Sequence, residues 1–282
     1  MIFKNAMSFK AKMKQVAVEK GLTAQQVQQF YLMELFLEKM AQSDFSENFI
    51  IKGGYLIGSI LGLQLRSTMD IDTTVKGFPL TEENVSRIMR EIARVPTESN
   101  FTFTFLSVGE IREGDDYPGY RVKIQAEYER IKEVITLDVT TGDVITPAEV
   151  SFFFPKLLEE ESIPMMAYPL ETVFAEKLEA ILTRGIATTR PRDFYDVYIL
   201  RKLKFDDVDS GKLKEALQNT IRKRKSPVQI DTYGKILFDL EQSDYQHLLW
   251  SKYQKQYAFA RDVAFLDTLD AIAAVMDSLF EE

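Results

Sequence analysis

The sequence predicts an α+β protein in which a mixed-sheet core is followed by a helical C-terminal half. Segments with alternating apolar residues, typical of strands, occur between about residues 48 and 147. After Pro155, segments with apolar residues at helical spacing dominate, and no internal repeat is present. We therefore expect two domains, one of residues 1–150 with an N-terminal helix and the core, and a mostly helical one of residues 151–282.

The individual elements follow from spacing and from turn residues. Residues 9–40 have helical spacing, which Gly21 and Thr23 interrupt with a break and a new helix start. A short strand or turn is expected at 48–54, helices at 55–61 and 81–95, and strands at 69–75, 101–108, 120–128 and 134–140. Turn signals stand at Gly114, Pro118 and Gly142. Further helices are expected at 172–182, 194–203, 213–222 and 262–279.

The composition excludes several kinds of site. The 282 residues include no cysteine, so disulfides, thiolate metal sites and a cysteine nucleophile are excluded. His247 is the only histidine, so one chain cannot build a zinc site from several imidazoles. No apolar run is long enough to span a membrane, and the basic first 15 residues lack the apolar run of a signal peptide. We expect a cytoplasmic protein that does not bind membranes.

The charge is unevenly distributed along the chain. A net charge of −8 argues against a protein whose whole surface binds nucleic acid. Between residues 171 and 230, however, 13 Lys or Arg stand against 9 Asp or Glu, and positions 222–225 are all basic. This run is either a solvated helix end or part of a local basic patch.

The most informative segment carries two acids. Asp70 and Asp72 lie two positions apart on an expected strand, so they share one face while Ile71 enters the core. Two carboxylates so close repel each other unless a divalent cation lies between them. Mg²⁺, or Mn²⁺ as an alternative, would bind such carboxylates together with phosphate oxygens. Surface acids often produce this pattern, so the pair alone is weak evidence.

Other residues strengthen this interpretation. Asp138 is a lone acid in an otherwise apolar strand, where it needs a partner, and it is a candidate third metal ligand. Gly53 and Gly54 have no side chains, so their backbone N–H groups can approach phosphate oxygens. Thr68, two positions before Asp70, would share the face of the acids and contact a phosphate, or is an ordinary strand threonine.

The helical half contains a lysine that borders a buried stripe. Lys177 lies three positions after Phe174 and four before Ile181, so it needs a negative partner. That partner is either a triphosphate or, for a lysine that reaches to solvent, Glu176 or Glu179. Asp193 could simply cap the helix that Phe194 begins, and Arg190 and Arg192 could be surface charges.

Taken together, these motifs resemble those of a known family. A Gly-Gly turn, a helix, a D-x-D strand and an acid on a later strand resemble the DNA polymerase β-like nucleotidyltransferases. The AbiEii/AbiGii-type nucleotidyltransferase toxins, of type IV toxin–antitoxin or abortive-infection pairs, are similar in further motifs. These motifs are Lys52-Gly53-Gly54, Arg66-Ser67-Thr68-Met69-Asp70-Ile71-Asp72, Glu176-Lys177-Leu178-Glu179-Ala180 and Arg192-Asp193-Phe194-Tyr195-Asp196, within residues 50–203.

The resemblance implies a polymerase β-like core and a set of roles. Asp70, Asp72, Lys177 and Asp193 would be catalytic, with Asp196 as the other candidate for the last position. Nucleotide-binding residues would be Gly53, Gly54, Arg66, Thr68 and Lys177, and metal ligands Asp70, Asp72 and Asp138. The chain would transfer a nucleotide from a nucleoside triphosphate to an RNA acceptor, such as tRNA. Its antitoxin would be a winged-helix repressor.

Two rival hypotheses remain open. A small-molecule nucleotidyltransferase, such as one that modifies an antibiotic, would use the same metal site with another acceptor. A catalytically silent nucleotide-binding module would retain the fold without turnover. Metal-dependent turnover of a triphosphate separates the silent module from both enzymes, and the labelled acceptor separates the enzymes from each other.

Overall fold

The computed structural model describes residues 1–111 and 119–280, and the expected turn at Gly114 and Pro118 lies outside these residues. The chain forms two compact units. The first comprises residues 1–142 and 150–167, and the second comprises residues 143–149 and 168–282. This division differs from the boundary expected after residue 150, because residues 150–167 complete the sheet of the first unit.

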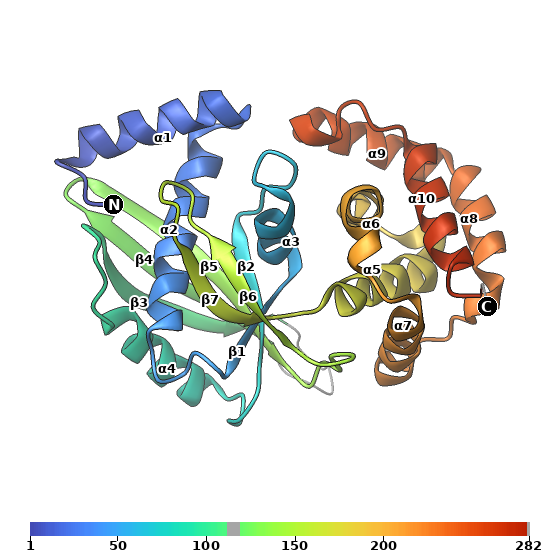
Figure 1. The fold of residues 1–282 in the computed structure, drawn as a ribbon, viewed down its shortest axis with the longest axis horizontal. Helices are drawn as coiled ribbons and strands as arrows, with labels where there is room; N and C mark the ends of the chain where they lie inside the picture. Colours follow the sequence, from blue (N-terminus) through green and yellow to red (C-terminus); the bar gives the residue numbers. More distant parts are fainter. Residues whose placement is uncertain (112–118, 281–282) are drawn as a thin grey trace. The chain divides into compact units, whose positions relative to one another are not determined.

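A mixed seven-stranded sheet forms the centre of the first unit (Figure 1). Its strands are β1 (Phe49–Lys52), β2 (Asp70–Val75), β3 (Thr102–Glu110), β4 (Gly119–Tyr128), β5 (Ile131–Thr141), β6 (Val150–Pro155) and β7 (Ser162–Ala167). The spatial order is β3-β4-β5-β2-β1-β7-β6. The pairs β2–β5 and β1–β7 are parallel, and the other neighbours are antiparallel. The α+β class with a mixed sheet is therefore confirmed.

In the described part of the first unit, the sheet is accompanied by α1 (Ala6–Lys20), α2 (Ala24–Ala41), α3 (Gly53–Leu61) and α4 (Glu82–Arg94). The expected break between α1 and α2 is present. Gly21 ends α1 in the left-handed conformation, with φ of 65°, and the Thr23 hydroxyl accepts from the Gln26 backbone N–H to cap α2. The local signals in the sequence therefore place these helices correctly.

Strands β6 and β7 were not expected from the sequence. Their connecting turn is fixed to α2 by contacts with distant residues. Lys156 Nζ lies 3.0 Å from Glu38 Oε1, and the Leu157 N–H donates to Glu34 Oε2 over 2.6 Å. Burial raises the pKa of Glu34 to about 8, so this carboxyl is mostly protonated at neutral pH. These contacts span more than 100 residues, so no local pattern reveals the hairpin.

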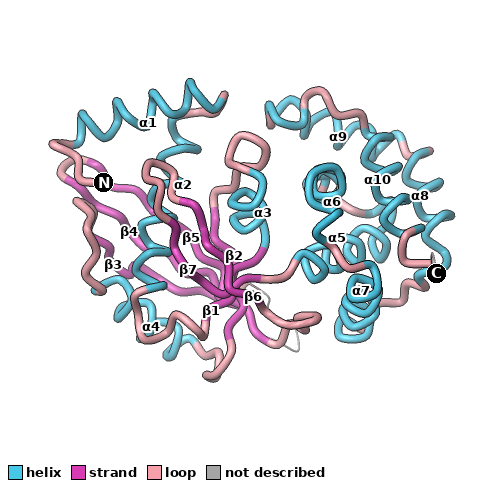
Figure 2. Tube along the Cα trace, in the orientation of Figure 1, coloured by secondary structure: helices cyan, strands magenta, loops and turns pink. Residues whose placement is uncertain are grey.

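In the second unit, the regular elements formed by the described residues are all helices (Figure 2). Its α-helices are α5 (Leu170–Arg184), α6 (Pro191–Lys204), α7 (Ser210–Arg224), α8 (Tyr233–Glu241), α9 (Asp244–Gln256) and α10 (Phe265–Asp277). The expected helices correspond to α5, α6, α7 and α10, whereas α8 and α9 were not expected. Helix α5 packs on α6 and α7, and α10 packs on α6.

Segment 143–149 belongs to the second unit through specific hydrogen bonds. The Thr146 N–H donates to Thr172 Oγ1 over 2.9 Å, and the Tyr168 hydroxyl donates to the Asp143 carboxylate over 2.8 Å. Asn219 Nδ2 donates to Thr146 Oγ1 from α7. Among the described residues, no helix has the length and apolar character that crossing a membrane requires.

Candidate functional site

A cluster of three carboxylates lies on one face of the sheet in the first unit. Asp72 is paired in register with Asp138 on the parallel strand β5, and Asp70 lies two positions earlier. Residues paired across neighbouring strands project to the same face, as do residues two apart on one strand. One carboxylate oxygen from each of the three acids lies within 4.8 Å of the others. Ile71 is fully buried, as expected for the residue between the two acids.

The two glycines bring the backbone against this cluster. Helix α3 begins at Gly53, whose φ is +64°, and Lys52 at the N-cap provides no side-chain cap. A Cβ atom on Gly53 would lie 2.0 Å from Asp72 Oδ2, and one on Gly54 would lie 2.9 Å from Thr68 Oγ1. Glycine is therefore required here because the helix start closely approaches the acids. The start of α3 consequently lies against the Asp72 carboxylate.

Thr68 and Arg66 belong to the same neighbourhood. Thr68 precedes β2 rather than forming part of it, and its hydroxyl donates to Asp70 Oδ1 over 2.8 Å. Arg66 is buried, and its Nη1 donates to the Ser67 carbonyl. A Cβ atom on Gly54 would lie 3.2 Å from Arg66 Nη2, which places the guanidinium next to the glycine turn.

Arg121 is a part of this cluster that the sequence did not single out. It is paired in register with Asp138 across β4 and β5. Its Nε donates to Asp138 Oδ1 over 2.8 Å and its Nη2 to Oδ2 over 2.7 Å, a bidentate contact. Hydrogen bonds and attraction from Asp138, with smaller contributions from Asp70 and Asp72, raise the pKa of Arg121. The register of two strands creates this pair, so sequence spacing alone does not predict it.

The donor set of this cluster fits a hard divalent cation. Three carboxylates supply only oxygen ligands, which Mg²⁺ and Mn²⁺ prefer. Asp138 already shares both oxygens with Arg121, whereas Asp70 accepts the Thr68 hydroxyl on one oxygen. A cation bound by all three acids would therefore compete with the Arg121 guanidinium for Asp138.

We expect Arg121→Gln to tighten the binding of Mn²⁺ by about tenfold. A positive charge close to a divalent cation costs on the order of 1–2 kcal/mol even in a medium of high dielectric constant, and the substitution removes it. Titration with Mn²⁺ followed by electron paramagnetic resonance checks this. Arg87→Gln, at an exposed arginine on α4, is the matched control. Weaker Mn²⁺ binding in Arg121→Gln would mean that Arg121 organises the ligands instead of competing for one.

A second charged cluster lies in the second unit. Lys177 on α5 is nearly buried, and its Nζ lies 2.7 Å from Asp193 Oδ1 and 2.8 Å from Asp196 Oδ2 on α6. Arg190 Nε lies 2.7 Å from Asp193 Oδ2. Both aspartates are fully buried. Each of the two candidates for the last motif position therefore contacts the lysine.

The pKa of Asp193 reflects these neighbours. Burial alone would raise it, but attraction and hydrogen bonds from Lys177 and Arg190 lower it from 3.8 to about 2. Because the folded pKa is lower than the unfolded one, ionised Asp193 stabilises the folded unit at neutral pH. That contribution is fully present above about pH 4 and is lost as the pH falls through about 2.

The negative partners that the sequence offered for Lys177 are engaged elsewhere. Arg224 on α7 donates to Glu176 over 2.9 Å and to Glu179 over 2.5 Å. Lys177 itself is buried and pairs with Asp193 and Asp196, so it does not reach to solvent. The contacts with the two glutamates tie Arg224 to α5, so the basic run at 222–225 is in part a structural element and not only a solvated helix end.

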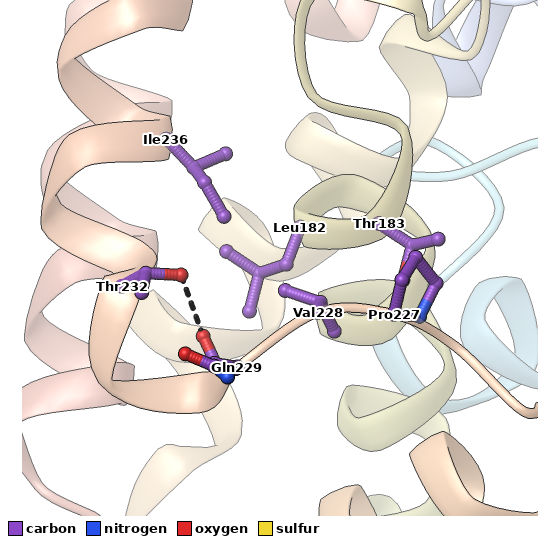
Figure 3. Close-up of a pocket in the computed structure, with 7 residues that line it drawn as sticks. All are labelled: Leu182, Thr183, Pro227, Val228, Gln229, Thr232 and Ile236. Atoms are coloured by element: carbon purple, nitrogen blue, oxygen red, sulfur yellow. Dashed lines mark hydrogen bonds between the residues drawn. The ribbon is translucent and has the colours of Figure 1, made fainter.

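A small hollow in the second unit carries no comparable chemistry (Figure 3). It is lined by Leu182, Thr183, Pro227, Val228, Gln229, Thr232 and Ile236. The Thr232 hydroxyl donates to the Gln229 carbonyl over 2.7 Å. No side chain that lines the hollow is ionisable, so we assign it no acid–base or metal chemistry.

Comparison with solved structures identifies the fold. A candidate nucleotidyltransferase from H. pylori superimposes with a TM-score of 0.53 at 15% identity, covering 93% of this chain and 100% of the other. JHP933 from Helicobacter pylori superimposes with a TM-score of 0.52 at 15% identity, covering 92% and 95% of the two chains. The fold is therefore that of nucleotidyltransferases. A comparison with curated proteins found no match.

A family model decides the assignment. The model described as "Nucleotidyl transferase AbiEii toxin, Type IV TA system" matches residues 35–275, which is most of the chain and includes both charged clusters. The protein belongs to the AbiEii family of nucleotidyltransferase toxins from type IV toxin–antitoxin systems. The resemblance found in the sequence motifs is thereby confirmed, and the chain is a nucleotidyltransferase.

Proposed function

We propose that this nucleotidyltransferase transfers a nucleotide from a nucleoside triphosphate to RNA, most simply the 3′ end of tRNA, with Mg²⁺ as cofactor. The observation that carries the metal-dependent part is the cluster of Asp70, Asp72 and Asp138 on one face of the sheet. The RNA acceptor rests on the family resemblance and on the excess of basic residues between positions 171 and 230.

In this proposal the residues of the first unit bind the cations and the phosphate groups of the triphosphate. Asp70, Asp72 and Asp138 would hold divalent cations, which would supply neutralisation of the triphosphate charge. The N–H groups at Gly53 and Gly54, at the start of α3, donate to phosphate oxygens. Arg66 and Thr68 lie beside these glycines and contact the same phosphates.

The reaction forms one bond and breaks another. The acceptor hydroxyl oxygen attacks the α-phosphorus, and the bond to the β-phosphate oxygen breaks, so pyrophosphate leaves. A carboxylate oxygen of Asp138 accepts the hydroxyl proton, a role that requires Asp138 to give up part of its contact with Arg121. A direct contribution of Lys177 and Asp193 to transfer remains a prediction from the family resemblance.

The biological setting follows from the family. A type IV toxin acts beside a cognate antitoxin, and we propose that the antitoxin here is a winged-helix repressor. We also propose a cytoplasmic location, which an RNA acceptor and a repressor partner would support. A small winged-helix reading frame directly beside the gene would support this part of the proposal.

The test is the fate of a labelled nucleotide. The full-length protein is incubated with Mg²⁺, total RNA, small-molecule acceptors such as aminoglycosides, and each α-labelled nucleoside triphosphate in turn. We expect label in RNA of tRNA size, and loss of that label with EDTA or in Asp72→Asn. Label confined to a small molecule would make the small-molecule hypothesis correct. Absence of turnover with every triphosphate would favour the silent nucleotide-binding module.

A further inference from the structure

Residues 245–261 form an unusual stretch in an acidic chain. They include no Asp or Glu, although the whole protein has a net charge of −8. Their basic residues are Lys252, Lys255 and Arg261, and their aromatic residues are Tyr245, Trp250, Tyr253, Tyr257 and Phe259. Interleaved aromatic and basic residues are typical of surfaces that bind single-stranded nucleic acid.

The structure gathers several of these aromatic residues around Tyr195 of α6. The ring centroid of Tyr195 lies 4.8 Å from that of Phe259, 6.2 Å from Tyr253 and 6.5 Å from Tyr198. Tyr257 stacks on Phe259 with centroids 5.3 Å apart and an interplanar angle of 24°. Tyr195 belongs to the motif that also contains Asp193, but the proposed chemistry gives it no role.

Part of this cluster is open to solvent. Tyr198, Tyr257 and Phe259 are half-buried, and Lys202 and Arg261 are exposed. We call these five residues the aromatic-basic surface. The Lys202 Nζ lies 5.6 Å from the centroid of the Tyr198 ring and 3.4 Å from its hydroxyl, so charge and ring are adjacent.

Acidic side chains of α6 do not offset this charge. Helix α6 has only two acids, Asp193 and Asp196, and both are buried against Lys177. Tyr195, Tyr198 and Lys202 follow one another at helical spacing, and the Tyr195 ring contacts residues 253 and 259. One helix therefore holds the buried ion cluster and also contributes Tyr198 and Lys202 to a solvent-facing surface.

We propose that the aromatic-basic surface binds a single-stranded segment of RNA, with a base stacked on the half-buried Tyr257 and phosphates near Lys202 and Arg261. Every base has an aromatic face, so stacking suits a single strand of any sequence, whereas a duplex hides these faces. The positive side chains of Lys202 and Arg261 supply electrostatic attraction for phosphates. This inference rests on the proposed RNA acceptor and adds where an unpaired end is held.

The test measures binding separately from transfer. Fluorescence anisotropy of the full-length protein is recorded with a labelled single-stranded oligoribonucleotide and with the same oligonucleotide in a duplex. We expect Tyr257→Ala to weaken single-strand binding by about tenfold, within the range that loss of one stacked base produces. Tyr257→Phe keeps the ring and should bind like the wild type.

The contribution of Lys202 and Arg261 is measured by the salt dependence of RNA binding. Lys202→Ala combined with Arg261→Ala should reduce the slope of log affinity against log salt by about 1.4 for a single strand. Matched controls are Phe238→Ala and Lys235→Ala on α8, an exposed aromatic residue and an exposed lysine outside the surface. Both controls should leave single-strand binding unchanged.

Three outcomes would overturn the inference: unchanged binding in Tyr257→Ala, equal losses for duplex and single strand, or loss of antitoxin binding with RNA binding intact. The last would make this surface a protein interface. The proposed function is tested independently by label transfer. If RNA is labelled equally well by the wild type and by Tyr257→Ala, the proposed function is supported and the proposed RNA-binding surface is contradicted. If single-strand binding depends on Tyr257 but no label is transferred to RNA, the RNA-binding surface is supported and the proposed function is contradicted.

Discussion

Asp72→Asn is expected to abolish nucleotidyl transfer while leaving the fold intact. The substitution keeps the size of the side chain but removes a negative charge from the cluster that includes Asp70 and Asp138. Loss of one ligand should weaken cation binding and reduce the rate by at least about 100-fold, because the developing charge on the triphosphate is no longer neutralised. The rate of label transfer at saturating Mg²⁺ measures this.

Two controls make this result specific. Asp239→Asn, at an acid on α8 that pairs with the exposed Lys235, should retain full activity. Thermal unfolding of Asp72→Asn should match that of the wild type, since Asp72 is half-buried and the shape is preserved. Full activity of Asp72→Asn at ordinary Mg²⁺ concentration would contradict the assignment of Asp72 as a metal ligand.

Lys177→Ala is expected to destabilise the second unit by about 3–5 kcal/mol, the usual cost of removing one partner from a buried ion pair. Asp193 and Asp196 would each lose a contact of 2.7–2.8 Å while remaining buried. Trp250 is the only tryptophan and lies buried in the second unit, so its fluorescence reports unfolding of that unit. Urea titration of this signal gives the change in unfolding free energy.

The same substitution should also reduce transfer by orders of magnitude, as the family resemblance implies for Lys177. The stability measurement decides how that loss is interpreted. If Lys177→Ala is folded but inactive, Lys177 has a role in binding or catalysis. If the variant is unfolded as well as inactive, the role of Lys177 is to stabilise the buried ion cluster. Lys235→Ala on α8 is the matched control. An unchanged urea midpoint in Lys177→Ala would contradict a structural role for this lysine.

The sequence predicted those features that depend on neighbouring residues. The break between the first two helices follows from Gly21 and Thr23, and the shared face of Asp70 and Asp72 follows from strand spacing. For Gly53 the sequence predicted a close approach of the backbone to phosphate oxygens, which stays a prediction. The structure adds that any Cβ there would collide with Asp72.

Helices α8 and α9 are local elements that sequence reasoning missed, whereas the other missed features depend on long-range pairing. The contact between Arg121 and Asp138 requires the register of β4 on β5. The turn between β6 and β7 is fixed by Glu34 and Glu38 on α2, more than 100 positions away. Likewise, Arg224 engages the glutamates that spacing had offered to Lys177. Local patterns carry no information on such partners.

The path of the chain between the two units determines how the protein can be divided. The backbone leaves the first unit after Gly142, supplies Asp143–Glu149 to the second, returns for Val150–Ala167, and leaves again. A fragment that ends at residue 142 would lack β7, the parallel neighbour of β1, and a fragment that begins at 168 would lack Thr146 and its hydrogen bonds. Dividing the chain at one position therefore cannot yield two fragments that each contain a complete unit. During synthesis on the ribosome, likewise, the sheet stays incomplete until residue 167 has emerged.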